Sequence, residues 1–386
     1  MKRKILVMYG GVCPEHEVSV VTALQVMEAL KEGGFEVLPL YISKKGEWCL
    51  GDENFLKPEL YKDLGEVKRK SKRIIISPDK EWNLLNKGWW GFGGMEKTVD
   101  AVFPVFHGRL GEDGAIQGLL EHANLPYVGC EVLAGAVGID KYVAKRVAES
   151  EGIKVSKDIL VVKSKWRKNK KEFLKQVKKL KMPVFVKPVS LGSSIGMVKV
   201  NKLGELEDAL EVAFCYDSRL LVEEEVKKMK EVNISILGND PYRLSVTEEP
   251  VSGEEMLSFS DKYEGSKKTK GMAGAKRLIP ARISKKMQNK VENQAEKFFR
   301  SIGGKGIARV DFMVTKDEVY FNEINTMPGS LAFYLWEKSG ISFERLVRQL
   351  VELAINNWFE KQKLTTTFES NILKNFGEKG LKGKKT

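Results

Sequence analysis

The sequence has few cysteines. Its 386 residues include four, Cys13, Cys49, Cys130 and Cys215, which show neither C-x-x-C spacing nor the density of a secreted disulfide framework. This scattered pattern excludes a small disulfide-stabilised domain. We expect reduced thiols and a cytoplasmic protein.

The sequence also lacks a long apolar run. Its apolar stretches, such as Ile74-Ile75-Ile76, have the length of a strand, whereas a membrane-spanning helix needs about 20 apolar residues. The N-terminal residues 4–9 predict a strand and contain no signal-peptide core. We therefore expect no membrane partner.

The basic runs lack the aromatic pattern of a nucleic-acid-binding protein. The formal net charge is +13, and basic residues gather at 68–70, 163–171 and 374–384. None of these runs is interleaved with stacking aromatic residues as a single-strand binder requires. We expect no nucleic-acid partner, and we interpret the lysines as a solvated surface that also attracts anionic substrates such as ATP.

Strands and helices alternate along the chain, which is typical of an α/β protein. A chain of 386 residues is too long for one compact core and predicts two or three domains. We expect an N-terminal unit at 1–126, a central unit at 127–219, a third unit at 220–362 and a basic tail at 363–386. Residues 44–98 are irregular with some strand. The other expected strands are 3–9, 36–42, 99–106, 184–187, 196–200, 308–314 and 319–325, and the expected helices are 14–31, 113–123, 140–150 and 170–180.

The two strands at 308–314 and 319–325 are the most informative part of the sequence. If a three-residue loop joins them, Asp311 lies opposite Glu323, with Asn325 and Arg309 nearby. Arg309, Asp311 and Met313 are expected on one face, and Phe321, Glu323 and Asn325 on another. Two adjacent carboxylates repel each other unless a cation lies between them, and a set of oxygen ligands this small favours Mg²⁺.

A solvated amphipathic hairpin is the alternative interpretation of these two strands. The segment Asn325-Thr326-Met327-Pro328-Gly329 weakens it, because turn chemistry follows the oxygen donors directly. Arg309, beside the carboxylates, would suit a phosphate oxygen.

A long loop of small residues, 188–196, follows the strand that contains Lys187. Small residues let the backbone approach a ligand, and successive N–H groups can hold phosphates. A plain hairpin turn is the alternative, but such turns need only two to five residues. We interpret the loop as a phosphate lid. It is no P-loop, because no GK[ST] sequence precedes a helix.

Taken in order, these motifs resemble those of the ATP-grasp enzymes, and within them the D-alanine–D-alanine ligases, over nearly the whole chain. The motifs that carry the resemblance are Gly10-Gly11 to Ser19, the run 107–114, Val186-Lys187-Pro188 with the run 192–197, the run 220–225, Arg309-x-Asp311, Glu323-x-Asn325 and the run 325–329. The resemblance implies an α/β, three-domain ATP-grasp architecture. A Rossmann-like, preATP-grasp N-terminal domain would precede two α+β subdomains that sandwich ATP.

The resemblance also implies an ATP site. Lys141 and Lys187 would contact adenine or the α- and β-phosphates, Glu223 and the backbone near Glu225 would read the adenine, and Glu231 would hold the ribose. Lys262 would reach the γ-phosphate, and Ser193, Ser194 and Asn322 complete the implied set. Asp311, Glu323 and Asn325 would bind two Mg²⁺ ions, for which Mn²⁺ is a substitute. For Lys141 and Lys262, a plain surface charge is the alternative.

For the amino-acid substrate, the resemblance implies that Glu15 takes the ammonium of the first D-alanine and bonds to Ser193 and Tyr263. Capping of the helix that follows is the alternative role for Glu15. His107 and Glu112 would flank the same pocket, although His107 could equally be a packed loop histidine. Arg309 and the N–H of Gly329 would stabilise the tetrahedral intermediate.

One position departs from the family pattern. The family commonly has a serine that binds the carboxylate of the second amino acid, and Tyr334 occupies its place in this chain. Either the Tyr334 hydroxyl substitutes, or Ser330 does, or the pocket accepts a substrate other than D-alanine.

The implied activity is ATP-dependent ligation of two D-alanines for peptidoglycan synthesis, by a homodimer. A ligase for another acceptor and a nucleotide-binding regulator without turnover are the alternatives, and the conjunction of Arg309, Asp311, Glu323 and Asn325 argues against the second.

Overall fold

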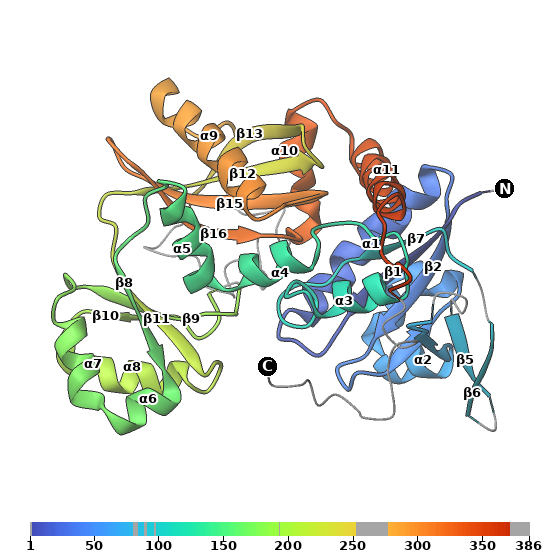
Figure 1. Cartoon of the computed structure of the whole chain (residues 1–386), viewed down its shortest axis with the longest axis horizontal. Coiled ribbons are helices and arrows are strands. Elements are labelled where there is room, and N and C mark those ends of the chain that lie inside the picture. Colours follow the sequence, from blue (N-terminus) through green and yellow to red (C-terminus); the bar gives the residue numbers. More distant parts are fainter. Residues whose placement is uncertain are drawn as a thin grey trace, which may run out of the picture.

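The computed structural model describes residues 2–79, 84–88, 91–95, 98–192, 194–251 and 277–370. Within these ranges the chain forms three β-sheets with helices packed against them (Figure 1). No helix in these ranges combines the length and the apolar character needed to cross a lipid bilayer.

The N-terminal sheet has the strand order β6-β5-β4-β3-β2-β1-β7. Its parallel centre consists of β2 (Glu36–Ile42), β1 (Lys4–Gly10) and β7 (Ala101–Pro104), and β1 is buried along almost its full length. The remaining elements of this unit are α1 (His16–Glu32), β3 (Trp48–Leu50), η1 (Glu53–Leu56), η2 (Pro58–Lys62), α2 (Leu64–Arg69), β4 (Lys72–Ile76), β5 (Leu84–Gly88), β6 (Gly91–Met95) and α3 (Ala115–His122).

A four-stranded antiparallel sheet, β10-β9-β11-β8, forms the second layer. It consists of β8 (Asp158–Val162), β9 (Val184–Pro188), β10 (Val198–Val200) and β11 (Arg219–Glu224). Trp166 lies fully buried in the core between this sheet and its helices. These helices are α6 (Lys163–Lys168), α7 (Lys170–Val177), η3 (Leu203–Glu205) and α8 (Leu206–Ala213).

The third sheet has the order β14-β13-β12-β15-β16. Its strands are β12 (Lys230–Gly238), β13 (Tyr242–Pro250), β14 (Arg277–Leu278), β15 (Ile307–Val314) and β16 (Val319–Asn325). Helix α9 (Lys285–Ser301) covers one face, where alternate apolar residues such as Val310 and Phe312 meet Phe298 (Figure 1). The polar residues of the same strands therefore occupy the opposite face, which carries the site described below.

The remaining helices tie the sheets together. Helices α4 (Val132–Ile139) and α5 (Lys141–Ser150) contribute to the core of the third sheet. Beyond β16, η6 (Gly329–Ala332), α10 (Phe333–Lys338) and α11 (Phe343–Gln362) return to the N-terminal unit, where Trp336 and Leu350 join the same core as Tyr9. The polypeptide that follows the hairpin is thereby fixed against α1.

The expected strands and helices are largely confirmed, with shorter ends. The helix expected from residue 14 begins at His16, that expected at 113–123 spans Ala115–His122, and that expected at 170–180 ends at Val177. The long helices α9 and α11 were not predicted. The division at 126/127, 219/220 and 362/363 stays a prediction, although β11 extends the four-stranded sheet to Glu224, five residues past the second boundary.

Candidate active site

The β15–β16 hairpin places Asp311 opposite Glu323, as the sequence predicts, but by a different route. Val314 pairs with Val319, so four residues, 315–318, form the loop and the expected three-residue loop is wrong. A one-residue shift of register just before Phe312 compensates for the extra loop residue. Without this bulge, Asp311 would face Asn322.

The same bulge corrects the predicted faces of β16. Phe321 pairs with Phe312 and is fully buried in the core beneath α9, so it does not share a face with Glu323 and Asn325. Because alternation breaks at Asn322 and Glu323, both side chains lie on the polar side and line one cavity. The sheet face therefore presents one more polar group than strict alternation allows.

Asp311 lies under Arg309, which holds it with two hydrogen bonds. Arg309 Nε donates to Oδ1 and Nη2 donates to Oδ2, both at 2.7 Å, and Asn325 Nδ2 donates to Oδ2 at 3.2 Å. Burial raises the pKa of Asp311 to about 6 although Arg309 lowers it, and the charge of Glu323 adds to the rise.

These donors fit a divalent cation. The buried Asp311 faces the half-buried Glu323, and burial together with the charge of Glu323 raises the pKa of Asp311. In the part of the chain that the structure describes, no three His, Cys, Asp or Glu side chains converge on a metal position. Asn325 and oxygens of a bound phosphate would therefore have to complete the coordination shell, as is usual for Mg²⁺.

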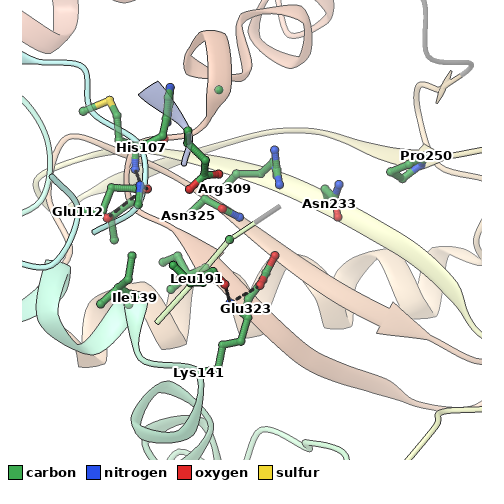
Figure 2. Close-up of a pocket in the computed structure, with 18 of the residues that line it drawn as sticks. His107, Glu112, Ile139, Lys141, Leu191, Asn233, Pro250, Arg309, Glu323 and Asn325 are labelled. Carbon is green, nitrogen blue, oxygen red and sulfur yellow. Dashed lines mark hydrogen bonds and ion pairs between the residues drawn. The ribbon is translucent and has the colours of Figure 1, made fainter. Parts of the chain in front are cut away.

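Two cavities meet beside this hairpin and share Lys141, Leu191, Glu231 and Glu323. Lys141 Nζ lies 3.0 Å from Glu323 Oε2 and donates to the carbonyl of Leu191 at 2.6 Å (Figure 2). Lys141 is thus no plain surface charge, because it links the central lid loop to the hairpin.

The first cavity, between the second and third sheets, contains the predicted nucleotide residues. Lys141, Lys187, Ser194, Glu223, Glu225, Glu231 and Asn322 all line it. Lys187 Nζ lies 2.8 Å from Glu223 Oε2, and Lys199 Nζ lies 2.9 Å from Glu225 Oε1. Ser193 and Lys262, which complete the predicted set, lie outside the described residues.

Glu223 belongs to a buried charge network that sequence reasoning missed. Lys145, only 1% exposed, lies 3.3 Å from Glu223 Oε1 and 2.7 Å from Asp158 Oδ2. Burial alone would raise the pKa of Glu223, but Lys145 and Lys187 outweigh it and lower that pKa to about 2. Glu223 is therefore a carboxylate fixed in place, ready to accept a hydrogen bond.

The second cavity, between the N-terminal unit and the third sheet, contains the predicted amino-acid residues. It is lined by Glu15, His107, Glu112, Arg309, Glu323, Asn325, Gly329 and Tyr334, among others. Glu15 precedes α1 and is 6% exposed, but its side chain makes no capping hydrogen bond to that helix. A Cβ added to the lid residue Gly192 would lie 3.2 Å from Glu15 Oε1, so the lid backbone closes directly over this carboxylate. Tyr263, the other predicted partner of Glu15, lies outside the described residues.

Glu112 connects the N-terminal unit to the turn after β16. Its Oε2 accepts from the N–H of Gly108 at 2.7 Å, and its Oε1 accepts from the N–H of Met327 at 2.8 Å. Burial raises the pKa of Glu112 to about 8, with a further contribution from the charge of Glu15. Glu112 thus fixes the turn that presents Gly329.

His107 has protein partners on both ring nitrogens. Nδ1 donates to the carbonyl of Met327 at 2.9 Å, which leaves Nε2 to accept from the Thr22 hydroxyl at 3.1 Å. Burial lowers the pKa of His107 to about 4, so the ring is neutral at physiological pH. These contacts favour the packed-histidine alternative over direct contact with substrate.

Tyr334 and Ser330 are the two residues predicted as alternatives for binding the acceptor carboxylate, and both stay predictions. The Tyr334 hydroxyl donates to Glu248 Oε1 at 2.7 Å, and the buried Ser330 does not line the cavity. Arg277 Nη1 lies 3.1 Å from Glu248 Oε2 and its guanidinium stacks 4.3 Å from the centre of the Tyr334 ring. Glu248, Arg277 and Asn233 were not predicted, because only strand pairing brings them together.

Models of known families match this chain in two parts. The model described as D-ala D-ala ligase N-terminus matches residues 4–130, and that described as D-ala D-ala ligase C-terminus matches residues 147–352. The chain belongs to the D-alanine–D-alanine ligase family.

Curated relatives agree with this family over nearly the full length. A D-alanine–D-alanine ligase of Geobacillus kaustophilus is 37% identical over 375 residues, covering 96% of this chain and 99% of the relative. A D-alanine–D-alanine ligase B of Clostridium tetani is 37% identical over 364 residues, covering 92% and 94%.

Solved structures of the family share the fold. The VanG D-Ala:D-Ser ligase of Enterococcus faecalis superimposes with a TM-score of 0.78 at 30% identity, covering 92% of this chain and 100% of that one. The D-alanine–D-alanine ligase of Coxiella burnetii gives 0.77 at 30% identity, covering 94% and 96%. The predicted ATP-grasp fold is therefore confirmed. Family members are ligases that use ATP and a divalent metal, so both belong to this family's chemistry.

Proposed function

We propose that this chain is an ATP-dependent ligase that joins two molecules of D-alanine through an acyl phosphate, for peptidoglycan precursor synthesis. The observation that carries the proposal is the junction of the two cavities. Lys141, Glu231 and Glu323 line both, so a nucleotide in one cavity would direct its phosphates at an amino acid in the other.

In the first step, a carboxylate oxygen of the first D-alanine attacks the γ-phosphorus of ATP, and ADP leaves. Glu15, buried beneath the lid, holds the ammonium of this D-alanine. Arg309 supports the negative charge on the transferring phosphoryl group, while Lys141 and Lys187 hold the remaining phosphates. The product is D-alanyl phosphate.

In the second step, the amine of another D-alanine attacks the acyl carbon and loses a proton. Arg309 and the N–H of Gly329 stabilise the tetrahedral oxyanion, and phosphate leaves with one oxygen of the first carboxylate. Glu112 contributes by fixing the turn before Gly329 through the N–H of Met327. We propose that the lid over Glu15 excludes water, which would otherwise hydrolyse the acyl phosphate. Ser193 in this lid, and Lys262 and Tyr263 in a second loop, are predicted to help, but they lie outside the described residues.

We further propose that Asp311, Glu323 and Asn325 hold two Mg²⁺ ions, for which Mn²⁺ can substitute. When bound, such ions neutralise charge on the β- and γ-phosphates. The ion pair between Arg309 Nη2 and Asp311 Oδ2 fixes the guanidinium beside the Asp311 carboxylate. We also propose a homodimer in the cytoplasm. All four cysteines lie in the described ranges and none forms a disulfide, which supports that compartment.

A different acceptor is the second candidate, because Tyr334 stands where the family has a serine and because one structural relative is a D-Ala:D-Ser ligase. A single experiment separates the candidates. Phosphate release is measured with ATP and Mg²⁺ across D- and L-amino acids, singly and in pairs, and the product is identified by mass. D-alanine alone should support release and yield the dipeptide. Phosphate release that does not depend on D-alanine, or no turnover at all, would contradict the proposal.

A further inference from the structure

A row of polar side chains crosses the open face of the third sheet. Strand pairing aligns Glu323 with Asp311, Asp311 with Asn233, and Asn233 with Glu248, and Arg277 on β14 reaches Glu248 at the end of the row. Glu323 and Asp311 are the two carboxylates proposed above as metal ligands. Asn233, Glu248 and Arg277 have no role in the function proposed above, although all three line the amino-acid cavity.

Arg277 is placed for the amino-acid substrate and not for the nucleotide. It lines the amino-acid cavity but not the cavity that contains the predicted ATP residues. Glu248 holds it by an ion pair of 3.1 Å, and the Tyr334 ring supports its guanidinium face at 4.3 Å. A guanidinium stacked on a ring directs its N–H donors along the plane of the group, which is the geometry that binds a planar anion such as a carboxylate.

Asn233 supplies an independent observation. Its side chain is 3% exposed, its Nδ2 donates to Glu248 Oε1 at 3.1 Å, and its Oδ1 has no hydrogen-bond partner. Figure 2 shows Asn233 in the pocket between Arg309 and Pro250. A buried carbonyl oxygen without a partner is costly, so this oxygen points to a donor on a bound ligand.

The two groups flank the same carboxylate. Asn233 and Arg277 bond to the two oxygens of a single carboxylate, Glu248, so the amide and the guanidinium are near neighbours. One offers an acceptor for an amine, and the other offers donors for a carboxylate. Glu15, proposed above for the first D-alanine, precedes α1 in the N-terminal unit, whereas Asn233 and Arg277 belong to the third sheet, where Arg309 lies on the strand next to Asn233.

We infer that Arg277 binds the carboxylate of the second amino acid while Asn233 Oδ1 accepts a hydrogen bond from its amine. Glu248 and Tyr334 are positioning residues, because they hold Arg277 and Asn233. This inference rests on the proposed ligase function. It places the specificity for the second substrate on residues that compensate for the missing family serine.

The test compares D-alanine with D-alaninamide as the acceptor, because the amide keeps the amine and lacks the carboxylate. In Arg277→Met, kcat/KM for D-alanine as acceptor should fall about ten- to a hundred-fold, while the value for D-alaninamide changes less than about two-fold. In Arg277→Lys, kcat/KM for D-alanine should lie between the wild-type value and that of Arg277→Met, because lysine keeps the charge and loses the planar fork. In Asn233→Leu, the values for both acceptors should fall, since both present the amine. The exposed Arg282, five residues along the chain, provides the matched control Arg282→Met with unchanged values.

Trapping with hydroxylamine tests the inference about Arg277 separately from the proposed ligase function. Hydroxylamine attacks D-alanyl phosphate without an acceptor carboxylate, giving D-alanine hydroxamate and phosphate. Arg277→Met should form hydroxamate at the wild-type rate, which also shows that the variant is folded. An Arg277→Met enzyme that makes hydroxamate and retains the wild-type preference for D-alanine over D-alaninamide would overturn the inference. A wild-type enzyme that makes no hydroxamate would instead overturn the proposed function.

Discussion

Lys141 Nζ lies 3.0 Å from Glu323 Oε2, at the point where the nucleotide cavity meets the amino-acid cavity. Lys141 begins α5, and Glu323 is on β16 of the third sheet. Since Lys141 also donates to the carbonyl of Leu191 in the lid, one ammonium connects three segments that meet only in the folded chain. A phosphate entering this junction would meet Lys141 together with Asp311 and Glu323, the proposed metal ligands.

Glu323→Gln should abolish most turnover and leave the fold intact. The amide keeps the shape of the side chain but removes one of the two charges that a divalent cation needs. Phosphate release at several Mg²⁺ concentrations measures the loss, and the thermal unfolding midpoint serves as the control. Near-normal phosphate release by a folded Glu323→Gln protein would contradict the assignment of Glu323 as a metal ligand.

Lys145→Met should destabilise the protein by about 3–5 kcal/mol, because it leaves the buried carboxylates of Asp158 and Glu223 without their shared cation. It should also weaken ATP binding, since Glu223 loses a group that keeps it ionised and in place. Urea unfolding and nucleotide titration measure the two effects. Lys170→Met, which removes an exposed pair with Glu207, is the control and should change the stability little. Equal effects of the two substitutions would argue against the network.

His107 should make the fold sensitive to mild acid. Its pKa is about 4 in the folded chain and 6.5 when unperturbed, so the unfolded state binds more protons in that interval. Stability contributed by the neutral ring is present above pH 6.5 and is lost as the pH falls through about 4, amounting to roughly 3 kcal/mol. The free energy of unfolding should therefore decline more steeply between these values in the wild type than in His107→Gln. If the free energy of unfolding fell equally with pH in the wild type and in His107→Gln, the low pKa of His107 would be contradicted.

Ser193→Ala should loosen the coupling of ATP hydrolysis to dipeptide formation. Loss of a hydrogen bond to a charged partner should cost about 1.5–3 kcal/mol, or roughly ten- to a hundred-fold in rate. The ratio of phosphate released to dipeptide formed measures the coupling. An unchanged ratio and rate would leave the proposed link from Glu15 to Ser193 and Tyr263 without support.

Tyr334→Phe should raise the KM for the acceptor amino acid and leave the KM for ATP unchanged. The hydroxyl donates to Glu248 Oε1, so its removal loosens the carboxylate that holds Arg277. The ring and its stacking remain, and the effect should therefore be smaller than that of Arg277→Met. Steady-state kinetics with D-alanine, and with D-serine as the next smallest candidate, measure it. An unaltered acceptor KM would place the carboxylate away from this cluster.

Local pattern predicted the parts of the site that lie within one hairpin or one loop. The pairing of Asp311 with Glu323 was predicted correctly because two adjacent strands pair directly, although the bulge that sets their register was not visible in the sequence. The sequence gives no local signal for this bulge, which leaves Phe321 in the core and turns Asn322 toward the cavity.

Residues that meet only through long-range pairing were missed. Glu248 and Arg277 are separated by 29 positions, and Asn233 approaches them through the pairing of β12 with β13. In the sequence, Lys145 resembles an ordinary helix lysine, and only the folded structure places Asp158 and Glu223 beside it. One signal was available, namely that a pocket without the family serine needs another hydrogen-bond donor for the acceptor carboxylate.

The acyl phosphate is tested most directly by following oxygen from substrate to product. The enzyme is given ATP, Mg²⁺ and D-alanine labelled with ¹⁸O in both carboxyl oxygens, and the phosphate and dipeptide are analysed by mass. Attack of the first carboxylate on the γ-phosphorus predicts one ¹⁸O in each phosphate released and three in each dipeptide. Dipeptide formed with unlabelled phosphate would contradict the account.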